Sequence, residues 1–200
     1  MMDELLKLLE HDYNSSVLKC KIVLIPKHII SEYINKNVHN YYEIGLIYQY
    51  YFNNIKMAKV YYINACELGH VNAMVKLGDY YNYIMHDYKL MELQYDCAIK
   101  LGSITAMIRM GDYYQYIVKN PDKMAHYYIM AINSNDSDAM FKLGYYYSNT
   151  KHDYDEAIKY YIMAAELGNI NAIKLLQYQY PDRFIINNFP SDSSKWLVQY

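Results

Sequence analysis

The sequence predicts an all-α protein, a right-handed α/α solenoid of helix pairs with a 33-residue period. Two observations lead to this prediction. All seven glycines fall into two series that share this period: Gly45, Gly78, Gly111 and Gly144, and then Gly69, Gly102 and Gly168, where Asn135 fills the remaining position. Alanine and tyrosine series keep the same step, among them Ala73, Ala106, Ala139 and Ala172, and Tyr62, Tyr95, Tyr128 and Tyr161. A fixed period of this length is typical of stacked repeat proteins.

The first helix of each repeat is expected near residues 38–52, 71–84, 104–117 and 137–149. Ala73, Leu77, Tyr81 and Ile84 are spaced by four, four and three residues, which places them on one helical face. Residue types suited to an N-cap stand before three helices of this series: Ser103, Asp136 and Asn169. The first glycine series lies inside these helices, where glycine costs about 1 kcal/mol relative to alanine. This predicts a close approach that a β-carbon would prevent, with tyrosines in the wider spaces and their hydroxyl groups near water.

The second helix of each repeat is expected near residues 54–68, 87–101, 120–134 and 153–167. The N-cap types again recur with the repeat period: Asn54, Asp87, Asn120 and Asp153. Pro121 follows Asn120 at the first helical position, where proline loses no hydrogen bond. The second glycine series ends these helices, because glycine adopts the left-handed conformation that closes a helix and asparagine is the next best residue.

The two ends of the chain depart from the repeat. Residues 1–37 are expected to form an N-terminal capping segment of one or two helices, the second beginning near Pro26. Residues 38–180 form the solenoid, four helix pairs followed by a single terminal helix over residues 170–180. The tail, residues 181–200, lacks a helical period but contains apolar residues such as Phe184 and Trp196. Two interpretations of the tail are open: a lid folded onto the last helix, or a docking segment.

The repeat resembles the Sel-one-like (Sel1-like) repeat family, a branch of the tetratricopeptide-like superfamily of α/α solenoids. The resemblance rests on A-x-x-x-L-G-x-Y-Y, then Y-x-x-A-x-x-L-G and a following alanine, over about residues 38–180. Asn40 replaces the alanine in the first repeat, and Ser134–Asn135 replace Leu-Gly in the third. The resemblance implies an adaptor that holds a protein or peptide partner.

Composition excludes several classes of function. The net charge is −2 and no basic block is present, which argues against a nucleic-acid partner. The apolar stretch 17–26 contains Lys19 and Lys21 and is too short to span a membrane, and the first ten residues are acidic and amphipathic, unlike a signal peptide. We therefore expect a cytoplasmic protein without a membrane partner. The three cysteines, Cys20, Cys66 and Cys97, are expected to be free thiols.

No catalytic, metal or cofactor motif is found. The seven histidines contain no H-x-x-x-H pair, and His86 and His152, at one repeat position with Lys119 between them, are expected to be exposed loop residues. No phosphate-binding loop, nucleophile elbow or dinucleotide-binding fingerprint occurs in the sequence. The sequence therefore predicts a protein that is not an enzyme and has neither metal nor cofactor.

The side of the first helices opposite the core is expected to line the concave surface of the solenoid. Its residues form the candidate partner-binding groove: Gln49, Tyr50, Asp79, Asn82, Tyr83, Ile108, Asp112, Gln115, Tyr116, Phe141 and Tyr145. Aromatic residues beside amides suit an extended peptide. The apolar series Tyr42, Val75, Ile108 and Phe141 has two open interpretations, packing between first helices or groove. Lys76, Arg109 and Lys142 form a basic row, in which we expect Lys76 to pair with Asp79 and Arg109 with Asp112, three residues later on a solvated face.

The leading functional hypothesis is a protein–protein interaction scaffold that binds a peptide or helical segment of a partner in its concave groove. Two alternatives come from other classes. A hydrolase-type enzyme acting on a small or cell-wall-like ligand is implied by the activity credited to a few members of the resembled family. A self-assembling structural subunit is the other, and the oligomeric state is left open.

Overall fold

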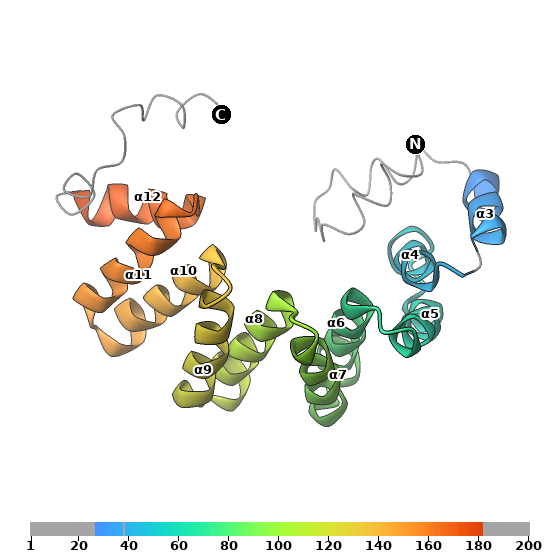
Figure 1. The fold of residues 1–200 in the computed structure, drawn as a ribbon, viewed down its shortest axis with the longest axis horizontal. Coiled ribbons are helices and arrows are strands. Elements are labelled where there is room, and N and C mark those ends of the chain that lie inside the picture. The colour runs from blue at the N-terminus through green and yellow to red at the C-terminus, as the bar shows by residue number, and fades with distance from the viewer. Residues whose placement is uncertain (1–26, 38, 182–200) are drawn as a thin grey trace. The chain divides into compact units, whose positions relative to one another are not determined.

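The computed structural model describes residues 27–37 and 39–181 of the 200-residue chain. All regular elements in these ranges are helices (Figure 1). The chain divides into two compact units, the first ending at Ala106 and the second beginning at Met107. Residues 1–26 and 182–200 lie outside the described residues, and with them most of the predicted capping segment and of the tail. The domain limits 1–37, 38–180 and 181–200 therefore stay predictions.

The four predicted helix pairs are present, and each first helix ends in five π-helical residues. The first helices are α4 (Tyr41–Leu46) with η1 (Ile47–Tyr51), α6 (Val71–Tyr80) with η2 (Tyr81–Met85), α8 (Ile104–Tyr113) with η3 (Tyr114–Val118), and α10 (Ser137–Tyr146) with η4 (Tyr147–Lys151). The second helices are α5 (Ile55–Glu67), α7 (Tyr88–Lys100), α9 (Pro121–Ile132) and α11 (Tyr154–Glu166). α3 (Lys27–Lys36) precedes the pairs and α12 (Ile170–Gln179) follows them. The all-α fold with a 33-residue repeat is confirmed.

The helices begin where the sequence predicts. Each predicted N-cap side chain accepts a hydrogen bond from the backbone N–H three residues later, as Asp87 does from Leu90 at 3.1 Å and Asp136 from Ala139 at 2.8 Å. This satisfies one of the backbone donors that a helix start leaves without an intrahelical partner. His70 caps α6, a position that the sequence analysis did not assign, and its Nδ1 accepts from Ala73 N–H at 3.4 Å.

Left-handed residues close both helices of a repeat. Gly69, Gly102 and Gly168 have φ values of 79°, 84° and 82°, and Asn135 has 58°, as predicted for the ends of the second helices. The π-helical ends of the first helices were not predicted from the sequence. Each is followed by a non-glycine residue with positive φ: Asn53, His86, Lys119 and His152. His86 and His152 are exposed loop residues, as expected. Both have the left-handed backbone conformation that follows the end of a first helix.

Each glycine inside a first helix makes room for a tyrosine ring of the second helix. The pairs are Gly45 with Tyr62, Gly78 with Tyr95, Gly111 with Tyr128 and Gly144 with Tyr161. A β-carbon on Gly111 would lie 2.3 Å from Cε1 of Tyr128, well inside van der Waals contact. The predicted close approach is confirmed, and the group that approaches is an aromatic ring.

The same four tyrosines correct a second expectation. They are completely buried, so their hydroxyl groups do not face water. A hydroxyl removed from water needs a hydrogen-bond partner, because an unsatisfied buried polar group is costly. The partners of three of them lie on the first helices, among the residues predicted to form the groove.

Candidate functional site

The predicted groove residues of the first unit lie toward the C-terminal ends of two successive first helices. Gln49 and Tyr50 are on η1, Asp79 is on α6, and Asn82 and Tyr83 are on η2. Tyr83 is 57% exposed, and the other four are half-buried. Together the two helix ends present one exposed aromatic ring, that of Tyr83, and the half-buried amide and carboxylate groups of Gln49, Asn82 and Asp79.

Two of these polar residues hold the buried tyrosines. Tyr62 donates its hydroxyl hydrogen to Oε1 of Gln49 at 2.6 Å, and Tyr95 donates to Oδ1 of Asp79 at 2.7 Å. A hydrogen bond to a carboxylate is stronger than one between neutral groups. Gln49 and Asp79 therefore keep fixed positions, and they link the first helix of each pair to the second.

The predicted groove residues of the second unit lie on α8, η3 and α10. Ile108 and Asp112 are on α8, Gln115 and Tyr116 on η3, and Phe141 and Tyr145 on α10. Tyr116 and Tyr145 are 59% and 45% exposed, whereas the other four are half-buried. This unit therefore offers two exposed tyrosines together with part of two apolar side chains.

Asp112 and Gln115 both contact the hydroxyl group of the third buried tyrosine. The hydroxyl oxygen of Tyr128 lies 2.7 Å from Oδ1 of Asp112 and 2.8 Å from Oε1 of Gln115. Burial, followed by the charge of the neighbouring Asp112 carboxylate, raises the pKa of Tyr128 above its ordinary value. The hydroxyl therefore stays protonated and remains a hydrogen-bond donor at physiological pH.

The basic row of first-helix residues connects neighbouring repeats. Nζ of Lys142 lies 2.8 Å from Oδ1 of Asp112 in the preceding repeat, and Nζ of Lys76 lies 3.1 Å from the hydroxyl of Tyr50. The sequence predicted only pairs within one helix, because spacing along a helix is visible in the sequence and contacts between helices are not.

The fourth repeat lacks the carboxylate and amide acceptors of the third. Tyr145 and Ser148 occupy the repeat positions of Asp112 and Gln115. The buried ring of Tyr161 lies 5.6 Å from the ring of Phe141, and burial raises the pKa of Tyr161 to about 12. The first-helix surface is thus more aromatic and less acidic in the fourth repeat than in the third.

The apolar series Tyr42, Val75, Ile108 and Phe141 was interpreted either as packing between first helices or as part of the groove. Each interpretation fits two of the four residues. Tyr42 and Val75 are buried and belong to the core. Ile108 and Phe141 are half-buried, so each presents some surface to a ligand. The sequence could not separate these cases, because all four residues are apolar and occupy the same repeat position.

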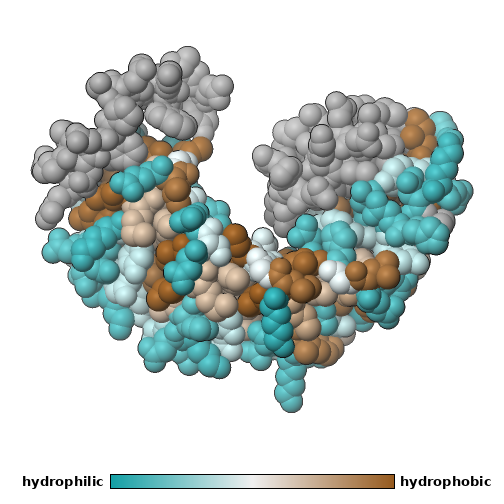
Figure 2. Space-filling view, in the orientation of Figure 1, coloured by the Kyte–Doolittle hydropathy of each residue, from teal (hydrophilic) through white to brown (hydrophobic). Residues whose placement is uncertain are grey.

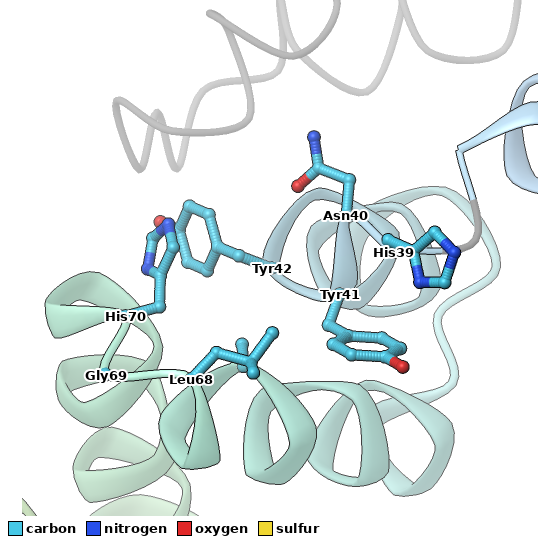
Figure 3. A pocket seen from close by; sticks show the side chains of 8 residues that line it. His39, Asn40, Tyr41, Tyr42, Leu68, Gly69 and His70 are labelled. Atoms are coloured by element: carbon cyan, nitrogen blue, oxygen red, sulfur yellow. The ribbon is translucent and has the colours of Figure 1, made fainter.

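A shallow depression of about 330 Å³ lies at the N-terminal end of the first repeat (Figure 3). It is lined by the segment 39–42 and by the turn from Leu68 to His70. His70 stacks on Tyr42 with the ring centroids 4.2 Å apart while it caps α6. The depression contains none of the predicted groove residues.

Other kinds of site receive no support from the described part of the chain. No group of three His, Cys, Asp or Glu side chains there is arranged to hold a metal ion. Cys66 and Cys97 are free and half-buried. Among the described helices, none has the length and apolar character needed to cross a bilayer.

Known sequences and structures place this repeat in a family. The sequence pattern of the Sel1 repeat matches residues 41–70, 104–136 and 137–169. No curated protein matches the chain. A Sel1 repeat protein from Oxalobacter formigenes is similar in structure with a TM-score of 0.62 and 24% identity over 78% of this chain and 69% of that one.

Two further solved structures share the fold. A protective antigen of uropathogenic Escherichia coli that displays an SLR fold has a TM-score of 0.57 and 20% identity, over 71% of this chain. The match spans only 34% of that antigen. An immunity protein from Pseudomonas aeruginosa has a TM-score of 0.57 and 18% identity, over 92% of this chain and 74% of that one.

Three observations support the same family assignment. The Sel1 pattern matches three repeats, left-handed residues end the second helices, and a tyrosine packs on the glycine of each first helix. The residues between the matched repeats, 71–103, form α6 and α7 with the same caps and the same Gly78–Tyr95 contact. The chain is a Sel1-like repeat protein with the SLR fold.

Proposed function

We propose that the chain is a non-catalytic scaffold that binds a peptide or helical segment of a partner protein on the first-helix face. We define this face by the predicted groove residues of each unit. In the first unit they are Gln49, Tyr50, Asp79, Asn82 and Tyr83, and in the second they are Ile108, Asp112, Gln115, Tyr116, Phe141 and Tyr145.

The observation that carries the proposal is the exposure of aromatic rings beside polar groups that are already fixed. Tyr83 and Tyr116 are 57% and 59% exposed. Tyrosine is enriched among the residues that dominate binding energies at protein interfaces. Asp112 is held by Tyr128 and Lys142, so a ligand would not have to order it. Preorganised groups of this kind reduce the entropy that binding must overcome.

The structural likenesses are compatible with a protein partner but do not name one. The same fold serves as an immunity protein in P. aeruginosa. At 18% identity that likeness concerns the fold alone. The proposal therefore depends on the surface residues of this chain. The hydrolase and the self-assembling subunit remain alternatives, and no contact among the described residues favours either.

The test replaces two exposed rings and leaves the buried ones in place. We expect a Tyr83→Ala, Tyr116→Ala variant to lose the proteins captured by the wild-type chain from its native cell, as measured by quantitative mass spectrometry, with the thermal melt nearly unchanged. Aromatic anchors at interfaces can each contribute about 2 kcal/mol or more. Tyr154→Ala is the matched control, because Tyr154 is 52% exposed and lies on α11, a second helix outside the first-helix face.

Two results would contradict this assignment. Capture that is the same for the double variant and the wild type would remove the first-helix face as the binding site. A large loss of stability in the double variant would show that these tyrosines belong to the packing of the repeats.

A further inference from the structure

A second surface lies on the other side of the repeats, on the second helices. In α5 the residues Ala58, Tyr62 and Ala65 are buried, and Met57 and Val60 point away from them. Leu90 and Leu93 occupy the same positions of α7. We call Met57, Val60, Leu90 and Leu93 the outer patch. Each of the four is between 37% and 54% exposed, and both helices pack on α6 in the first unit.

The other repeats show that the fold does not require apolar residues at these positions. The residues 33 positions after Leu90 and Leu93 are Lys123 and His126. In the fourth repeat the corresponding residues, Glu156 and Lys159, form an ion pair at 2.6 Å. The same backbone position is therefore apolar in the first two repeats and charged or polar in the last two. Hydrophobic side chains also reach the surface over α6 and α7 in Figure 2.

The neighbouring charges change sign together with the apolar residues. Lys56 and Lys89 are exposed and directly precede Met57 and Leu90. The corresponding positions of the third and fourth repeats are the exposed Asp122 and Asp155. A change at three positions of the repeat at once favours a common cause, namely something that contacts the first unit on this side.

A further lysine of this surface is held in place. Nζ of Lys59 lies 5.2 Å from the centre of the Tyr80 ring and 5.5 Å from that of Tyr81, so its positive charge stays between α5 and the end of α6. The outer patch is thus bordered by lysines at the N-terminal ends of α5 and α7.

The acidic residues within the two helices lie further along them than Lys56 and Lys89. Glu67 ends α5, and on α7 the half-buried Glu92 is followed by the exposed Asp96, one turn beyond Leu93. Asp87 is engaged as the cap of α7. The exposed charges that directly precede Met57 and Leu90, at the N-terminal end of the outer patch, are therefore basic, whereas the half-buried Glu92 directly precedes Leu93.

We propose that the outer patch is a second protein-binding surface and that it fits an acidic amphipathic helix of a partner protein. Pairs of apolar side chains three residues apart on two successive helices suit the apolar face of a third helix. Carboxylates at one edge of that face would meet Lys56 and Lys89. A membrane is a poorer occupant, because Lys56, Lys59 and Lys89 are fewer than the cluster of about four to eight basic residues that anionic lipids attract.

The experiment uses the whole chain and a fluorescent peptide of known chemistry. The peptide is a helix of about 18 residues with leucines along one face and glutamates on the other, and its counterpart carries lysines in place of the glutamates. We expect fluorescence anisotropy to show binding of the glutamate peptide to the wild type and none of the lysine peptide. Leu90→Gln with Leu93→Gln, which removes both apolar side chains without adding charge, should weaken binding by about tenfold or more.

Further variants distinguish loss of peptide binding at the outer patch from loss of folding and from binding at the first-helix face. Lys56→Asp with Lys89→Asp copies the last two repeats and should weaken binding of the glutamate peptide at low salt. Met57→Gln with Val60→Gln gives a second test should the α7 variant fail to fold. Tyr83→Ala with Tyr116→Ala should bind the peptide as the wild type does, because both tyrosines lie outside the outer patch.

Three outcomes would overturn the proposal. Equal binding of the glutamate peptide by the wild type and by folded outer-patch variants would exclude this surface. Binding to vesicles of phosphatidylcholine and phosphatidylserine that exceeds binding to the peptide would identify a lipid surface as the occupant. A wild-type dimer that becomes monomeric in the outer-patch variant, measured by sedimentation, would identify a second copy of this chain.

Discussion

Replacement of Gly111 by alanine tests how the repeat is packed. The added β-carbon would lie 2.3 and 2.5 Å from two ring carbons of Tyr128. That ring is completely buried, and its hydroxyl is held by Asp112 at 2.7 Å and by Gln115 at 2.8 Å. The ring has to move by about an ångström to restore van der Waals contact. Such a shift would lengthen or break the hydrogen bonds at its other end.

Three contributions set the change in the free energy of unfolding: one stabilises the variant and two destabilise it. Alanine is favoured over glycine inside a helix by about 1 kcal/mol. Overpacking of a filled core costs about 1–3 kcal/mol, and a hydrogen bond to a charged group contributes about 1.5–3 kcal/mol. Because Asp112 is partly accessible to water, we use the lower end for the hydrogen bond, which leaves a net destabilisation of about 1.5–3.5 kcal/mol.

The fourth repeat supplies a matched control. A β-carbon on Gly144 would lie 3.0 Å from the ring of Tyr161 and 3.1 Å from the backbone oxygen of Ala157, so shifts of a few tenths of an ångström relieve both contacts. Gly144→Ala should therefore change the free energy of unfolding by less than about 1 kcal/mol, since the gain in helix propensity offsets the tighter packing. Denaturant melts followed by circular dichroism measure both variants.

A double-mutant cycle isolates the contact itself. In a Tyr128→Ala background the ring is gone, so adding Gly111→Ala should stabilise the chain by about 1 kcal/mol through helix propensity. A Gly111→Ala protein as stable as the wild type would refute the role assigned to the first-helix glycines. So would equal destabilisation by Gly111→Ala in the presence and in the absence of the Tyr128 ring.

Three further outcomes are expected. Asn135→Gly and Lys119→Gly should each raise the free energy of unfolding by roughly 0.5–1 kcal/mol in denaturant melts, because both residues have a φ of 58°. Asp112→Ala should lower the melting temperature and release the Tyr128 hydroxyl from its charged partner, which ultraviolet difference spectroscopy of tyrosine would detect as a changed environment. Burial raises the pKa of the Cys66 thiol from 9.0 to about 12. Below pH 9 the native thiol should therefore react with iodoacetamide at least a hundredfold more slowly than in the unfolded chain, and stability should fall as the pH rises above 9, because only the unfolded chain then releases this proton.

The fold was predictable because the start and the end of each helix depend on single residues that can be identified in the sequence. Helix starts depend on a cap residue and helix ends on a left-handed residue, and both are visible at single positions such as Asp87 and Gly102. The 33-residue step then confirmed each assignment several times over. The π-helical ends of the first helices were not visible, because no residue type marks a change from four-residue to five-residue hydrogen bonding.

The sequence by itself determined the helix pairs, their limits and the need for glycine inside each first helix. It also assigned the candidate binding residues to the first helices, where the structure has them. Only the tertiary structure decided what those residues contact. It buried Val75 while leaving Ile108 half-exposed, and it joined Asp112 to Tyr128 and Lys142. The physical reason is that burial and hydrogen-bond partners depend on side chains from neighbouring helices, 16 to 30 residues away in these cases, and periodicity within one helix does not record them.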